Sequence, residues 1–142
     1  MLDMFRAGIV GIGKLGSIHL RIYKGLKGIG KIYLADTNTK TLNLHKEYCH
    51  FKDYRDLKGK IDLVSIATPT SSHYEIASFF LKNKIPVLVE KPLTQDLKEA
   101  KKLTKSGIIS ATNFEKAVVR GISNTNKIII NSAQKVTRKV LK

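Results

Sequence analysis

Three glycines near the amino terminus have the spacing that binds phosphate groups. Gly11, Gly13 and Gly16 form a G-x-G-x-x-G pattern. The pattern follows an apolar run, Phe5 to Val10, and opens a stretch with helical periodicity. Gly11 would permit a tight turn, Gly13 would let a pyrophosphate approach the backbone, and Gly16 would let the helix pack closely on the strand. Free N–H groups and the helix dipole would then hold the phosphates. The predicted phosphate loop consists of Gly11, Ile12, Gly13, Lys14, Leu15 and Gly16.

An acidic residue follows at the distance where such a loop is paired with a ribose-binding group. Asp36 lies 20 residues beyond Gly16, at the end of a second predicted strand, Lys31–Ala35. Its carboxylate would accept hydrogen bonds from adenosine ribose hydroxyls and would repel a 2′-phosphate. No arginine follows Asp36 directly, and Lys40 is the nearest cation after it. These features favour NAD over NADP. The alternative interpretation is that Asp36 caps the next helix.

Two further polar clusters follow predicted strands. Ala67-Thr68-Pro69 closes the apolar run Ile61–Ala67, and Glu90-Lys91-Pro92 closes the run Val87–Val89. Open α/β sheets bind ligands at the carboxyl ends of their strands, so both clusters should lie on the cofactor edge. A lysine at this edge can donate a hydrogen bond to a carboxamide or to a substrate hydroxyl. We therefore expect cofactor contacts from Ala67, Thr68, Pro69, Glu90 and Lys91.

The elements that must position these residues alternate between strands and helices. Strands are expected at Phe5–Val10, Lys31–Ala35, His50–Phe51, Ile61–Ala67, Val87–Val89 and Ile108–Ala111. Helices are expected over Lys14–Leu26, from a cap at Thr37 or Asn38 to Tyr48, for one turn near Asp53–Leu57, from Ser72 to Asn83, and after Thr94. With right-handed crossovers, this order predicts an α/β Rossmann fold, a doubly wound parallel sheet with helices on both faces. The predicted domain spans residues 1–111, and residues 112–142 form a basic tail of uncertain structure.

Two further helix starts carry capping signals. Ser72 and Glu75 have the spacing of a capping box, in which the hydroxyl and the carboxylate each reach a free backbone N–H. Thr94 is predicted to cap the next helix, with Asp96 in its first turn. The inward face of that helix should carry Leu97, Ala100 and Leu103.

Charge is distributed unevenly along the chain. The net charge is +15, of which residues 101–142 carry +9. A basic tail can bind nucleic acid, but Phe114 is its only aromatic residue, so we do not expect nucleic acid as a partner. No apolar run approaches the ~20 residues of a membrane-spanning helix, and no secretory signal is visible. We therefore expect no membrane association and a cytoplasmic location.

Taken together, the motifs resemble one family of oxidoreductases. They are the strand followed by G-x-G-x-x-G-x-x-H at Gly11–His19, the acid Asp36, Ala67-Thr68-Pro69 with His73, and Glu90-Lys91-Pro92. This set, over about residues 5–106, is similar to the glucose–fructose oxidoreductase / inositol dehydrogenase (Gfo/Idh/MocA) family. The resemblance implies an NAD(P)-dependent sugar or cyclitol dehydrogenase. It also implies that Lys91 lies near the nicotinamide and has a catalytic role in substrate binding and proton handling, and that His73 belongs to the cofactor-side segment. From the residues alone we interpret His73 as structural and His19 as a packing residue of the first helix.

The sequence departs from this family after the cofactor motifs. Family members continue into a second domain that supplies the substrate pocket, a catalytic histidine and the dimer surface. The chain ends at Lys142, and none of its histidines matches that catalytic residue. We therefore expect a truncated form that binds NAD(H) and turns over a sugar or polyol substrate poorly or not at all alone. The alternative is a non-catalytic dinucleotide-binding or redox-sensing module, and an oligomer is left open.

Overall fold

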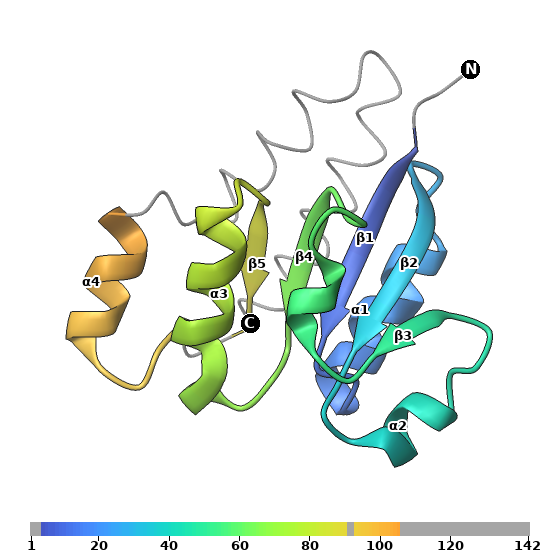
Figure 1. The fold of residues 1–142 in the computed structure, drawn as a ribbon, viewed down its shortest axis with the longest axis horizontal. Helices are drawn as coiled ribbons and strands as arrows, with labels where there is room; N and C mark the ends of the chain where they lie inside the picture. The colour runs from blue at the N-terminus through green and yellow to red at the C-terminus, as the bar shows by residue number, and fades with distance from the viewer. Residues whose placement is uncertain (1–3, 91–92, 106–142) are drawn as a thin grey trace.

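Five parallel strands form the centre of the molecule. The computed structural model describes residues 4–90 and 93–105. The strands are β1 (Phe5–Val10), β2 (Ile29–Ala35), β3 (Cys49–Phe51), β4 (Leu63–Ile66) and β5 (Val87–Val89), and their order in the sheet is β3-β2-β1-β4-β5 (Figure 1). The helices are α1 (Lys14–Lys24), α2 (Thr39–Asn43), α3 (His73–Lys82) and α4 (Leu97–Lys105), with short 3₁₀ turns at Tyr54–Leu57 and Thr70–Ser72. The predicted Rossmann arrangement is confirmed.

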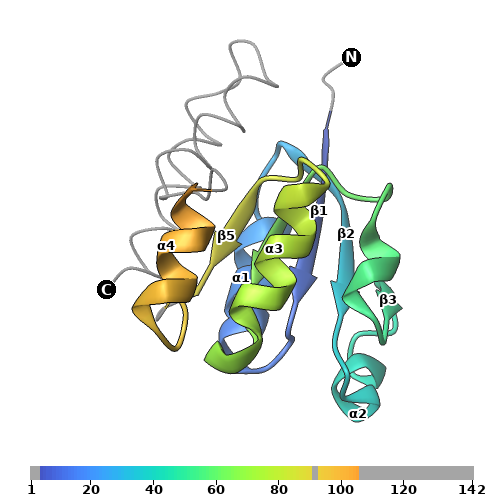
Figure 2. The ribbon, with the colours of Figure 1, turned by 60° about the vertical axis from the view of Figure 1, so that its left-hand side comes forward.

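Each face of the sheet is covered by its own hydrophobic core. On one face, Leu20 and Tyr23 of α1 pack with Leu42 of α2 against buried residues of the strands. On the other face, Phe80 of α3 and Leu103 of α4 pack against a second set of strand residues. In Figures 1 and 2, α1 and α3 accordingly lie on opposite sides of the sheet. Successive side chains of a strand point to opposite faces of the sheet, so the same strands contribute residues to both cores.

The order of the strands places the polar clusters at one edge. Strand β1 lies between β2 and β4, so the crossovers that follow β1 and β4 leave in opposite directions. Because all strands are parallel, the residues that follow β1, β2, β4 and β5 meet at the carboxyl edge of the sheet. The point at which the strand order reverses is where open α/β sheets bind ligands.

The helix that follows β2 is much shorter than predicted. Asn38 caps it as expected, since its side chain accepts hydrogen bonds from the backbone N–H groups of Lys40 and Thr41. The helix ends at Asn43 and not near Tyr48, and tighter turns follow it, in which each N–H bonds three residues back. Leu42 is its only buried residue, so a longer helix would gain little from packing.

The predicted capping box at the start of α3 is wrong. The Ser72 hydroxyl donates to the carbonyl oxygen of Pro69 at 2.8 Å and lies 2.7 Å from the hydroxyl of Thr68. The Glu75 carboxylate accepts from the hydroxyl of Tyr54 at 3.3 Å. A capping residue needs an extended backbone, whereas Ser72 is already helical because the 3₁₀ turn Thr70–Ser72 leads directly into α3.

The start of α4 also differs from its prediction. Asp96 caps the helix, because its carboxylate accepts from the backbone N–H of Glu99 at 2.8 Å. Thr94 instead donates its hydroxyl to the carbonyl oxygen of Asp96. Leu103 is buried as expected, but Leu97 is 69% exposed and does not face the core.

The predicted strand Ile108–Ala111 and the tail 112–142 lie outside the described residues. Among the helices of the described ranges, none has the length and apolar character needed to cross a membrane.

Candidate nucleotide-binding site

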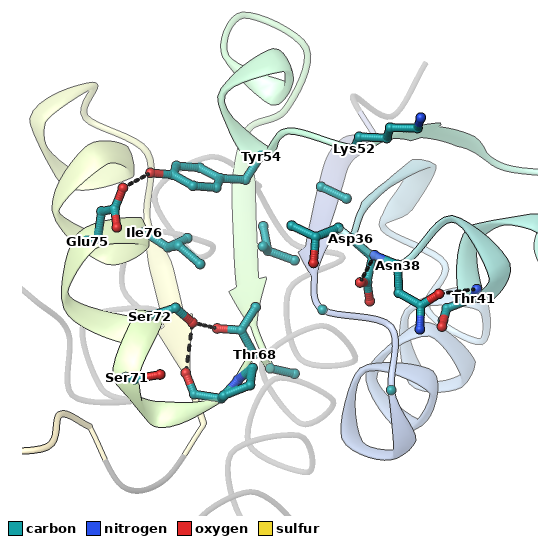
Figure 3. A pocket seen from close by; sticks show the side chains of 17 residues that line it. Asp36, Asn38, Thr41, Lys52, Tyr54, Thr68, Ser71, Ser72, Glu75 and Ile76 are labelled. Carbon is teal, nitrogen blue, oxygen red and sulfur yellow. Dashed lines mark hydrogen bonds between the residues drawn. The ribbon is translucent and has the colours of Figure 1, made fainter.

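A cavity of about 490 Å³ opens at the carboxyl edge of the sheet, at the reversal of strand order. Gly11 and Gly13 line it after β1, and Asp36 after β2. The residues that follow β4, Ala67-Thr68-Pro69, form the opposite wall together with the start of α3. Figure 3 shows Asp36 across the cavity from Ile76 and Glu75. The site is therefore a cleft between the two halves of the sheet.

The three glycines of the loop have different surroundings. Gly11 has a φ of +87°, and a Cβ there would lie 2.8 Å from the backbone of Ala67. A Cβ at Gly16 would lie 1.8 Å from the carbonyl oxygen of Gly11. A Cβ at Gly13 would meet no described atom within 4 Å. The backbone and close packing thus require glycine at 11 and 16, whereas at Gly13 the missing side chain leaves open space beside the cavity.

The loop and the first turn of α1 fit a pyrophosphate. Gly13 is the residue that precedes α1, and no side chain caps that end of the helix. The first N–H groups of a helix have no partner within it, and they carry the positive end of the helix dipole. Open space at Gly13 beside this uncapped terminus is the arrangement that accepts an anionic group.

Asp36 fixes the loop while facing the cavity. Its Oδ2 accepts from the N–H of Ile12 and its Oδ1 from the N–H of Asn38, both at 2.8 Å. These bonds tie the end of β2 to the phosphate loop. The alternative that Asp36 caps α2 is wrong, because Asn38 is the capping residue. Each carboxylate oxygen keeps a further lone pair that can accept from a ribose hydroxyl.

The far rim of the cavity is formed by Tyr54 and Glu75. The Tyr54 ring packs edge-on against Phe79 at 5.5 Å, and it also contacts Phe80. Burial and the charge of the neighbouring Glu75 carboxylate raise the pKa of Tyr54, so its hydroxyl remains protonated at neutral pH and donates to that carboxylate.

A buried polar cluster links α1 to the strands beneath the site. Nε2 of His19 lies 2.7 Å from Oε1 of Glu90, and both side chains are almost fully buried. One turn further along α1, the Tyr23 hydroxyl bonds to the Ser65 hydroxyl on β4. Burial raises the pKa of Tyr23 to about 12, although the bond to Ser65 acts in the opposite direction. The cluster holds the phosphate-loop helix against β4 and the end of β5, so His19 does more than fill space.

His73 joins two of the polar segments. Its Nε2 faces the carbonyl oxygen of Thr68 at 2.8 Å, and its Nδ1 faces that of Leu93 at 3.2 Å. The ring is buried and does not line the cavity. Its position agrees with a structural interpretation, in which it fixes the loop after β4 against the segment that precedes α4.

The structure brings some of the predicted site residues together and not others. The cavity is lined by Gly11, Gly13, Asp36, Ala67, Thr68 and Pro69. Ile12, Gly16, His73 and Glu90 are buried beside it, and Lys14 and Leu15 are exposed outside it. Lys91 lies outside the described residues.

Sequence reasoning missed several residues that line the cavity. Among them are Asn38, Thr41, Lys52, Tyr54, Ser71, Ser72, Glu75 and Ile76. The rule that ligands bind after parallel strands would have found Lys52, because it directly follows β3. Glu75 carried a signal, but that signal was assigned to a helix cap.

A parallel sheet with a glycine loop at its reversal point and an acid at the end of the next strand defines a dinucleotide-binding Rossmann domain. Residues 5–107 match the model of the oxidoreductase family with an NAD-binding Rossmann fold. The chain belongs to this family, and NAD is the cofactor that the family domain binds.

Curated relatives and solved structures agree with this assignment. The chain is 30% identical over 96 residues to a UDP-N-acetylglucosamine 3-dehydrogenase of Acidithiobacillus ferrooxidans, covering 67% of the chain and 31% of the relative. It is 25% identical over 136 residues to a myo-inositol 2-dehydrogenase of Thermotoga maritima, covering 89% and 41%. An oxidoreductase of Agrobacterium radiobacter, solved with NAD⁺, L-tartaric acid and magnesium, superposes with a TM-score of 0.68 at 25% identity, covering 73% of the chain and 32% of the structure. The chain thus spans about a third of the length of most of these proteins.

Proposed function

We propose that this chain holds NAD(H) for the oxidation of a hydroxyl group on a sugar or cyclitol, as the cofactor-binding part of a dehydrogenase. The observation that carries the proposal is the cavity at the strand reversal, where open space at Gly13 adjoins an uncapped helix terminus and Asp36 faces the same hollow. The named activities of the relatives, UDP-N-acetylglucosamine 3-dehydrogenase and myo-inositol 2-dehydrogenase, support the class of substrate.

Each predicted site residue has a role in this proposal. The loop from Gly11 to Gly16 binds the pyrophosphate through the free backbone N–H groups at the start of α1, and Asp36 binds the adenosine ribose. Ala67-Thr68-Pro69 contacts the dinucleotide from the strand β4 side. Glu90 and His73 act from buried positions, by fixing the segments on either side of Lys91.

Bound NAD⁺ would supply the hydride acceptor for a hydroxyl-bearing carbon. In this proposal Lys91 lies near the nicotinamide, donates a hydrogen bond to the substrate hydroxyl and helps to move its proton. Its place in the sequence, directly after Glu90 and two residues beyond the last residue of β5, supports that role.

We further propose that turnover requires the substrate domain that the family resemblance implies, and that the Rossmann unit by itself turns over polyols poorly or not at all. The Rossmann unit would span residues 1–111, with the basic segment 112–142 outside it.

Cys49 is a free and exposed thiol and the only cysteine of the sequence, which suits a reducing compartment such as the cytoplasm.

The proposal is tested by fluorescence titration with NADH and NADPH, followed by assays with a panel of inositols and nucleotide sugars. We expect saturable NADH binding, weaker NADPH binding and little turnover. Equal affinity for NADPH would remove Asp36 from its ribose role, and rapid turnover by the chain alone would contradict the need for a substrate domain.

A further inference from the structure

The rim of the cavity opposite Asp36 contains an acidic residue that neither the fold nor the proposed function explains. Glu75 has the sequence position of a capping-box acid, but its carboxylate does not contact the backbone at the start of α3. Among the described residues, the only hydrogen bond to the Glu75 carboxylate comes from the Tyr54 hydroxyl, at 3.3 Å. Figure 3 shows Glu75 and Tyr54 pointing toward each other across the rim.

The wall beside this pair suits a flat, apolar ring. Ile76 lines the cavity and is 5% exposed. The Tyr54 ring also lines it, and an edge-on contact with Phe79 and a tilted contact with Phe80 hold it in place. Aromatic rings and branched aliphatic side chains are the groups that bind the faces of nucleotide bases. This surface lies across the cavity from Asp36, where the proposed function places the adenosine ribose (Figure 3).

The polar side-chain atoms of Glu75 and Tyr54 offer only acceptors to a ligand. A carboxylate accepts hydrogen bonds and cannot donate them. The Tyr54 hydroxyl could donate, but its proton is already engaged with Glu75. A base that approaches the rim must therefore present a donor. Adenine carries an exocyclic amine at C6, whereas hypoxanthine and guanine carry a carbonyl oxygen there, which would face the carboxylate as a second acceptor. The N1–H donor of these two bases lies one ring position away, so it would reach the carboxylate only if the base shifted in the cleft.

We propose that Glu75, supported by Tyr54, selects a dinucleotide with a 6-amino purine by accepting a hydrogen bond from that amine. This inference rests on the proposed function and adds a residue that sets base specificity. A buried partner of this kind can reject a mismatched ligand by several orders of magnitude. Glu75 is exposed, so we expect discrimination of about tenfold, as for a single charged hydrogen bond weakened by solvent.

The test compares NAD with nicotinamide hypoxanthine dinucleotide, which differs only in its purine, by isothermal titration of the full chain. The wild type should bind NAD about tenfold more tightly. The variant Glu75→Gln keeps an acceptor for Tyr54 but can also donate to the hypoxanthine oxygen, so its preference for NAD should fall to twofold or less. The matched control is Glu99→Gln, the same change in the first turn of α4 and away from the cavity, and it should keep the wild-type ratio.

Thermal unfolding of each variant separates specificity from folding. Equal binding of the two dinucleotides by the wild type would overturn the inference, and so would an unchanged ratio in Glu75→Gln. A parallel loss of both affinities in Glu75→Gln would assign it a structural role and would overturn the inference as well. Absence of binding of either dinucleotide to the folded wild type would instead overturn the proposed function.

Discussion

Two glycines of the phosphate loop have opposite surroundings, so alanine at each position separates cofactor binding from packing. At Gly13 a Cβ would meet no described atom within 4 Å, whereas at Gly16 it would lie 1.8 Å from the carbonyl oxygen of Gly11. In Gly13→Ala, the reduced entropy of the unfolded chain stabilises by about 0.4–1 kcal/mol. The poorer helix cap costs about 0.5–1 kcal/mol, so the two effects nearly cancel.

In Gly16→Ala the backbone oxygen cannot move aside, and we expect destabilisation by about 3 kcal/mol or more. For a domain of this size that lowers the Tm by at least about 12 °C, whereas Gly13→Ala should stay within about 4 °C of the wild type. If the pyrophosphate passes over Gly13, the added methyl group should weaken NAD binding roughly 5- to 150-fold, the equivalent of about 1–3 kcal/mol of crowding.

Thermal unfolding and NAD titration of both variants measure these effects. Wild-type NAD affinity in Gly13→Ala would refute the placement of the pyrophosphate. A Gly16→Ala variant as stable as the wild type would refute the packing role of that glycine.

Three further perturbations test other parts of the site and fold. Asp36→Ala should weaken NAD binding and relax the discrimination against NADP, and paired titrations that show an unchanged preference would contradict the ribose role. His19→Leu removes the buried hydrogen bond to the Glu90 side chain and should cost about 1–3 kcal/mol in urea unfolding; a loss below about 0.5 kcal/mol would show that the pair is not needed. The hydrogen bond from Arg6 lowers the pKa of Asp62. The ionised Asp62 carboxylate therefore stabilises the fold above its unfolded-state pKa of about 4, and this stabilisation is lost as the pH falls through the lower folded-state pKa. Both groups are partly exposed, so Arg6→Gln should remove less than about 1 kcal/mol at pH 7 and flatten the stability curve below pH 4, as unfolding at a series of pH values would show.

Local sequence rules were sufficient where the residue and its task lie close together in the chain. The run from Phe5 to Val10 is strand β1, because a strand covered on both faces is apolar throughout most of its length. The loop Gly11–Gly16 follows it in the expected strand–turn–helix context. The polar residues at the carboxyl edge could be placed because parallel strands end on the same side.

Contacts between distant segments could not be predicted in this way. No periodicity relates His19 to Glu90, which lie 71 residues apart and meet only when α1 packs on the sheet. Glu75 was misjudged because a capping box and a cavity-facing acid have the same local pattern, and the 3₁₀ turn before α3 decides between them. Leu97 was misplaced because it is the first residue of α4, where it is exposed, whereas Leu103 further along the helix is buried.

The central claim is that the cleft at the strand reversal binds NAD through the open backbone at Gly13. Isothermal titration of NAD into the full chain and into Gly13→Asp tests it most directly, since a carboxylate at that position would face the pyrophosphate. The account predicts saturable binding of one NAD per wild-type chain and no measurable binding by a folded Gly13→Asp variant. Failure of the folded wild type to bind NAD, or equal affinity in the two proteins, would contradict it.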